Sequence, residues 1–278
     1  MPTFETPEPI TATVELDIGA VWITASERND TVVDVLPSDG AADADVRAAQ
    51  QTTVTYRGGK LLVKGPRKRS LFGRSGSLHV TIDLPAGSDV GGNAPLADFS
   101  CQGRFGDCRI KVSAGDIQVD EARNVDAKTE LGDIRVARAA GDAELVGAGR
   151  IEVGAVAGTA TIKNRNGDTT LGEVAGDLQA RASNGRITVE VARASVDAKT
   201  ALGGIRVGEV AGGQVSLETA AGDLEVGVRP STLAWLDVHT KLGTVRNSLG
   251  PAERPGGSEP TVEVRACTGL GNIVIRRS

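Results

Sequence analysis

The sequence predicts an all-β protein, a parallel β-solenoid (β-helix) of about nine to ten coils with a period of 17–19 residues, preceded by a β-rich cap. One observation is a repeated unit of glycine, a polar residue and an apolar-x-apolar segment. A second apolar-x-apolar segment lies roughly midway between successive units. The composition agrees, because 36 glycines and only seven aromatic residues in 278 suit thin aliphatic layers better than an aromatic core.

Residues 1–90 are predicted to form an N-terminal capping region. Their apolar and polar residues alternate as in strands at 15–18, 19–23, 31–35, 52–56, 60–63 and 78–84. The only good helix candidate runs over 41–51. A cap is expected on physical grounds, because the end of a solenoid exposes unpaired backbone N–H and C=O groups.

Residues 91–278 are predicted to form the solenoid. Regular units begin at Gly115, Gly132, Gly149, Gly167, Gly185, Gly203 and Gly222, with degenerate ones at Ala97, Gly243 and Gly271. A step of about nine residues accommodates one short strand and one tight turn, so two steps make one coil. We expect cap and solenoid to form one continuous unit, with an insertion at 248–260 and a last coil over 262–275.

The repeat units resemble those of a known family. The Gly-Asp-Ile-x-Val units, and the Asp-Leu-Pro-Ala-Gly-Ser segment at 83–88 that leads into them, look like the bacterial family of adhesin-like proteins of unknown function with β-strand repeats. The resemblance covers roughly residues 10–278. It implies a β-solenoid, a non-enzymatic role and, in some relatives, a link to cell-envelope stress, and it transfers no catalytic residue.

Net charge and the lack of recognisable targeting signals in the sequence argue against several classes of protein. The 31 basic and 36 acidic residues give a net charge of −5, which argues against overall steering toward nucleic acid, and no specific nucleic-acid motif is present. No apolar run is long enough for a transmembrane helix. The acidic, proline-rich start does not resemble a signal peptide, and three cysteines do not make a disulfide framework. We therefore expect a cytoplasmic location.

No enzyme, metal site or cofactor is predicted. A calcium roll needs stacked acidic turns, but Arg150 and Arg186 interrupt the column of residues that follow the glycines, so a surface salt-bridge ladder is favoured. His79 and His239 stand far apart in the sequence without a catalytic motif. Two further predictions concern the thiols: Cys101 and Cys108 take inward positions, whereas Cys267 takes an outward one.

A basic segment is the candidate contact with an anionic partner. It comprises Lys64, Arg67, Lys68, Arg69, Phe72 and Arg74. Cations hold phosphates while an aromatic ring inserts or stacks, so lipid and nucleic acid are both conceivable partners. The alternative is a charged loop that only aids solubility. A second basic stripe, formed by Lys128, Lys163, Arg181 and Lys199, is interpreted as a solvated face.

The sequence thus predicts a non-enzymatic, adhesin-like β-solenoid scaffold or binding module for an unknown protein or anionic surface. A self-assembling filament is the first alternative, because an open edge at the C-terminal coil could pair end to end with another copy. The terminal arginines or the 248–260 insertion could instead cover that edge. A polysaccharide-active solenoid enzyme, with two carboxylates in a groove, is the remaining alternative.

Overall fold

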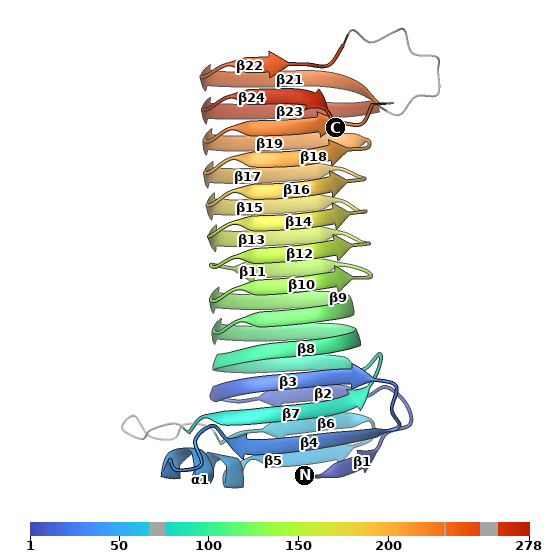
Figure 1. Ribbon diagram of the computed structural model, residues 1–278, viewed down its shortest axis with the longest axis vertical. Coiled ribbons are helices and arrows are strands. Elements are labelled where there is room, and N and C mark those ends of the chain that lie inside the picture. Colours follow the sequence, from blue (N-terminus) through green and yellow to red (C-terminus); the bar gives the residue numbers. More distant parts are fainter. Residues whose placement is uncertain (67–75, 231, 251–260) are drawn as a thin grey trace. The chain divides into compact units, whose positions relative to one another are not determined.

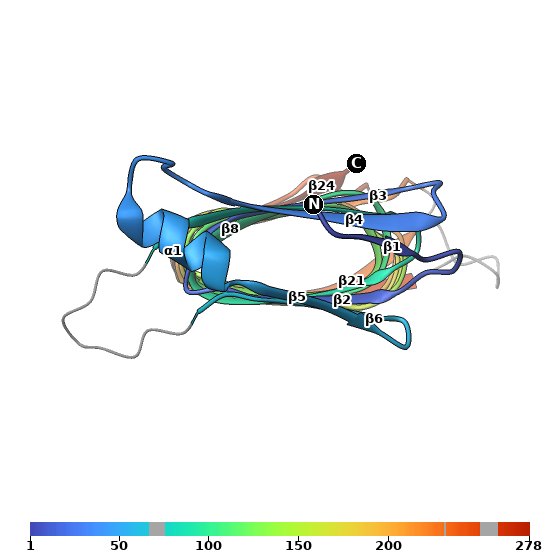
Figure 2. The same cartoon turned by 90° about the horizontal axis from the view of Figure 1, so that it is seen from below.

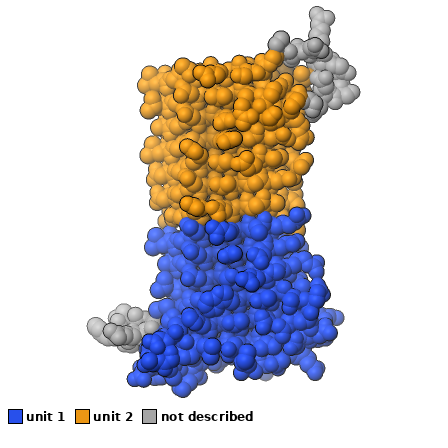
Figure 3. Space-filling model, in the orientation of Figure 1, with its two compact units in different colours: residues 1–138 blue, residues 139–278 orange. Residues whose placement is uncertain are grey.

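The computed structural model describes residues 1–66, 76–230, 232–250 and 261–278, and the chain forms two compact units, 1–138 and 139–278 (Figure 3). The predicted fold class is confirmed, because long stacks of parallel strands dominate both units. The expected helix is present as α1 (Asp43–Gln51). Within the described ranges, no helix is long and apolar enough to cross a membrane.

Unit 1 is built from strands that coil in parallel and from antiparallel strands at its N-terminal end. Its strands are β1 (Thr3–Glu5), β2 (Thr11–Glu15), β3 (Ile18–Ser26), β4 (Asp30–Pro37), β5 (Thr53–Arg57), β6 (Lys60–Lys64), β7 (Leu78–Pro85), β8 (Asp89–Ala114) and β9 (Ile117–Leu131), and β10 (Ile134–Ala139) follows. β2 and β3 form one coil, β6 and β7 another, and β8 wraps around both faces (Figure 1).

The spatial order of these coils differs from their order in the chain. β2 pairs with both β6 and β8, and β3 pairs with both β7 and β8, so β2 and β3 lie between β8 on one side and β6 and β7 on the other. Parallel coils therefore begin at Thr11, before residue 91. The strand predicted at 15–18 is wrong, because β2 ends at Glu15 and β3 begins at Ile18, which makes residues 16–17 a corner.

Antiparallel strands close the N-terminal end of unit 1. β4 pairs with β7, β5 with β6, and β1 with β4. The rings of Phe4 and Tyr56 meet with centroids 5.3 Å apart, and α1 lies at one end of the opening between β4 and β5 (Figure 2). The Asp45 carboxylate holds α1 in place by accepting hydrogen bonds from the Asp39 and Ser77 N–H groups at 3.1 and 2.9 Å.

Unit 2 repeats one coil with little variation. Its strands are β11 (Ala143–Gly147), β12 (Ile151–Val156), β13 (Ala160–Asn166), β14 (Thr169–Val174), β15 (Leu178–Asn184), β16 (Ile187–Ala192), β17 (Val196–Leu202), β18 (Ile205–Val210), β19 (Gly213–Ala221), β20 (Leu224–Val228), β21 (Leu233–Leu242), β22 (Val245–Asn247), β23 (Thr261–Leu270) and β24 (Ile273–Arg277). Ile187 pairs with Thr169 on one side and Ile205 on the other, which confirms the predicted register.

The order of the last coils contradicts the sequence prediction. β23 pairs with β19 and β21, and β24 pairs with β20 and β22, so the coil predicted to be last lies inside the stack (Figure 1). The coil of β21 and β22 is the outermost one. The physical reason is the burial of Val264 and Ile275, since apolar inward positions favour a level covered on both sides. Among the described strands of unit 2, the level paired on one side only is therefore that of β21 and β22, and the end-to-end contact expected at the C-terminal coil stays a prediction.

Candidate functional site

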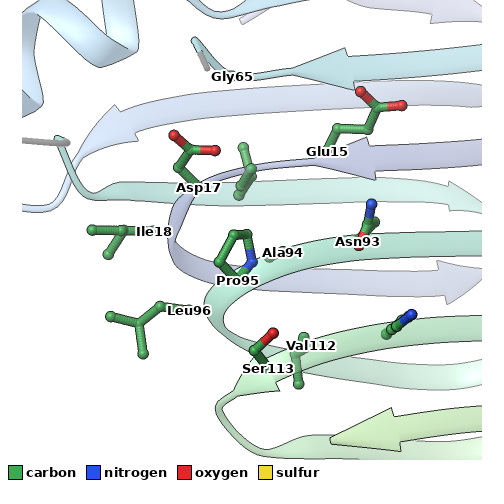
Figure 4. A pocket seen from close by; sticks show the side chains of 12 residues that line it. Glu15, Asp17, Ile18, Gly65, Asn93, Ala94, Pro95, Leu96, Val112 and Ser113 are labelled. Atoms are coloured by element: carbon green, nitrogen blue, oxygen red, sulfur yellow. The ribbon is translucent and has the colours of Figure 1, made fainter. Parts of the chain in front are cut away.

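The main candidate site is a cavity of about 620 Å³ in unit 1, at the corner between β2 and β3 (Figure 4). It is lined by Glu15, Leu16, Asp17, Ile18, Gly65, Asn93, Ala94, Pro95, Leu96, Lys111, Val112 and Ser113. These residues come from four separate stretches of the sequence. Only the folding of the coils brings them together, which is why the sequence did not reveal the cavity.

The cavity is amphipathic. Leu16 turns into the core and is 4% exposed, so its neighbours Glu15 and Asp17 are the residues that present carboxylates at the corner. The Glu15 Oε2 atom lies 3.0 Å from Nζ of Lys64. On the apolar side, Leu96 is 48% exposed, whereas other large apolar side chains of β8, such as Phe99 and Ile110, are buried.

Further polar groups and backbone hydrogen bonds define the walls. Lys111, Asn93 and Ser113 contribute an ammonium group, an amide and a hydroxyl group. The Gly65 N–H donates to the Glu15 carbonyl at 2.8 Å, and the Leu96 N–H donates to a carbonyl of the same corner, that of Asp17, at 3.1 Å. The cavity is thus a preformed pocket that suits a ligand with both polar and apolar groups.

The predicted basic segment is adjacent to this cavity in the sequence. Of its members only Lys64 is described, in its ion pair with Glu15. The others, Arg67, Lys68, Arg69, Phe72 and Arg74, lie outside the described residues. Gly65, the residue after Lys64, lines the cavity.

The column of residues after the corner glycines carries a hydrogen-bond ladder from coil to coil, whereas the salt-bridge ladder stays a prediction. Within unit 1, a carboxylate oxygen of Asp98 accepts from the Asp116 N–H, and Asp116 accepts from the Asp133 N–H, both at 2.8 Å. In unit 2 the Asp168 carboxylate accepts from the backbone N–H of Arg186 at 2.8 Å. Arginine therefore fits this column because its backbone is the donor.

Metal ligation finds no support in the described part of the chain, where no group of three or more His, Cys, Asp or Glu side chains could hold an ion. The two histidines lie on different units. His79 contacts the indole of Trp22 edge-on, with centroids 5.3 Å apart, and His239 is on the outer face of β21.

A second ladder, in the interior, was missed by the sequence reasoning. The Thr129 hydroxyl donates to the Gly115 carbonyl at 2.9 Å, and the Thr219 hydroxyl donates to the Gly203 carbonyl at the same distance. Thr268 repeats the bond to Gly222. A threonine or asparagine three positions before most of the corner glycines, such as Thr219 before Gly222, was the available signal.

The cysteines and the second basic stripe lie where they were predicted. Cys101 and Cys108 are buried and Cys267 is exposed. A hydrogen bond to Cys108, together with burial, raises the pKa of the Cys101 thiol well above its ordinary value. In the stripe, Arg181 is paired with Asp197, and Lys199 Nζ lies 2.7 Å from Glu218 Oε2.

Two of the solved structures that resemble this chain are described as candidate adhesins. One, from Bacteroides fragilis, is 12% identical with a TM-score of 0.40, and one from Parabacteroides merdae is 11% identical with a TM-score of 0.39; each match covers 99% of this chain and 95% of the other. A candidate cell adhesion protein from Clostridium sporogenes is 12% identical with a TM-score of 0.25, over 100% and 98% of the two chains. No curated protein matches.

The family model described as Toastrack DUF4097 matches residues 14–249. This range begins at the end of β2, runs through β3 and reaches past β21 and β22, and it confirms the resemblance seen in the repeat units. The chain belongs to the Toastrack DUF4097 family.

Proposed function

We propose that this protein is a non-enzymatic, adhesin-like β-solenoid binding module that holds a partner molecule at the corner cavity of unit 1. The single observation that carries the proposal is a cavity lined both by the exposed Leu96 and by Glu15, whose carboxylate is paired with Lys64. Ligand sites are typically cavities that combine apolar lining with a few placed polar groups. The family resemblance adds support for a role connected with cell-envelope stress.

A pull-down with a matched control tests this function. The full chain is immobilised and the partners it retains from soluble and membrane fractions are compared with those of Leu96→Arg. Leu131→Arg is the control, because Leu131 is a 68% exposed leucine of the same unit that does not line the cavity. We expect Leu96→Arg alone to lose the retained partner. Equal retention by both variants would show that the cavity is not the binding site.

A polysaccharide-active enzyme is the second candidate, because two carboxylates, Glu15 and Asp17, line the same cavity. Solenoid glycosidases use carboxylate pairs separated by about 5–10 Å. The test measures the release of reducing ends from a panel of polysaccharides. Release by wild-type protein that is lost in both Glu15→Gln and Asp17→Asn would establish this activity and replace the binding proposal. No release by wild-type protein supports the non-enzymatic role.

A further inference from the structure

The outermost coil of unit 2 exposes apolar side chains, and one of them, Val245, stands above a residue of the next level, Ile273, that is fully buried. Trp235 is 75% exposed, Leu242 67% and Val245 43%. The inward-pointing Leu236 and Val238 are only half-buried. These residues belong to β21 and β22, and among the described strands each of the two pairs on one side only.

An uncovered level of this kind lowers the stability of the unit, because apolar side chains stay in contact with water. The equivalent inward residues one level below, Val264 and Ala266, are fully buried under Leu236 and Val238. No other described strand pairs with the second edge of β21, so the N–H and C=O groups that point to that edge of this ten-residue strand have no strand partner there. Long apolar edges are where another strand adds to a sheet.

We propose that a second copy of this chain covers the edge, with the two β21 strands paired antiparallel across a two-fold axis. Head-to-tail stacking is disfavoured, because the first coil of unit 1 is already continued by the antiparallel strands β4 and β5 and closed by Phe4 and Tyr56. A two-fold contact needs only one kind of surface, and it closes after two copies. This inference is independent of the cavity in unit 1.

The sequence of β21 selects the register. In a two-fold pair, inward residues of one strand face inward residues of the other only if the axis passes through a residue position. An axis at Val238 pairs residues 234–242, and it places Asp237 opposite the partner's His239 and Trp235 opposite the partner's Lys241. These are a carboxylate with an imidazole and a cation with an aromatic face. An axis at Asp237 would instead oppose two carboxylates.

Molar mass in solution is the first test. Light scattering on the full chain, over a range of concentrations, is expected to show a dimer for wild-type protein and a monomer for Val238→Lys. Leu202→Lys is the matched control, because Leu202 is 57% exposed at a corner of β17, three levels from the edge, and should leave the dimer intact. A wild-type monomer at every concentration would overturn the proposal, as would a dimer that survives Val238→Lys.

Disulfide trapping tests the register in a Cys267→Ser background. Directly opposed residues have Cα atoms about 4.5–5.5 Å apart, within disulfide range. Val238→Cys lies on the axis and is expected to form covalent dimers on oxidation. Thr240→Cys alone should not, whereas a mixture of Thr240→Cys and Leu236→Cys should. Circular dichroism confirms that each variant is folded. Equal trapping by Thr240→Cys alone, or no trapping by Val238→Cys, would refute this register.

Discussion

Single side chains in the inward columns hold neighbouring coils together. Ile187 is 1% exposed and lies between Thr169 and Ile205, so every atom of its side chain contacts protein. The next residue, Thr188, points outward and is partly exposed. Inward and outward positions therefore differ sharply in their tolerance of charge.

Ile187→Asp is expected to lower the free energy of unfolding by about 3 kcal/mol or more, because it buries a carboxylate without a partner. Thr188→Asp should change it by no more than about 0.5 kcal/mol, as is usual at the surface. Chemical denaturation of both variants measures the difference. Similar midpoints for the two would contradict the register.

The thiols provide a prediction about pH. Because burial and the bond to Cys108 raise the pKa of Cys101 above the ordinary 9.0, the folded protein keeps a proton that the unfolded chain loses. The stabilisation is fully present below about pH 9 and declines as the pH rises further. Unfolding curves at increasing pH should show this decline in wild-type protein and a smaller one in Cys101→Val.

The same burial determines thiol reactivity. Cys267 should react at once with a water-soluble thiol reagent, whereas Cys101 and Cys108 should react only after denaturant is added. Rapid reaction of all three thiols in native protein would contradict the inward placement of the pair.

At the scale of elements, local patterns predicted the strands and helix better than they predicted corners. The helix expected at 41–51 is α1 at 43–51, because no other stretch of the cap has helical periodicity. The corner at 16–17 was misread as strand, since Leu16 continues the apolar alternation through the bend. The cavity could not be predicted for the same reason, because it depends on where the chain turns.

The basic segment is the element with a testable role that was drawn from the sequence. Replacing Arg67, Lys68, Arg69 and Arg74 by serine is expected to abolish sedimentation with anionic liposomes at about 50 mM salt, where screening is weak, and to leave the melting curve unchanged. Lys64 is retained in this variant because it pairs with Glu15. If wild-type protein does not sediment with the liposomes, the segment is only a solubilising loop. Retention on nucleic acid alone would point to that partner instead.

At the scale of the whole molecule, calcium should have no effect on stability. Aspartates of the corner column accept backbone hydrogen bonds, as Asp116 and Asp168 do, so one oxygen of each of these carboxylates is already bound to the next coil. A ligand that binds only the folded state must raise the melting temperature. We therefore expect the same temperature in saturating Ca²⁺ and in chelator, measured by differential scanning calorimetry, and a rise of several degrees would contradict the hydrogen-bond ladder.

The repeat predicted what a coil is, but it did not predict which coil lies beside which. The inward columns consist of similar aliphatic residues, so a given level can pack against more than one other level. Val215 pairs with Val264 in the structure, but Leu236 would fit the same position equally well. The order in which the coils pair then depends on how much apolar surface the complete unit buries. The sequence of a single repeat carries no information about that quantity. The cytoplasmic location and the end-to-end filament stay predictions of the sequence.

The placement of β23 and β24 has a consequence for biosynthesis. Residues 233–247 leave the ribosome before residues 261–277, yet in the finished unit the later segment separates the earlier one from β19 and β20. During translation, β21 and β22 must either stay unpaired until β23 and β24 are made, or pair first with β19 and β20 and then dissociate from them. The nascent chain therefore cannot complete this unit by adding coils in the order of their synthesis.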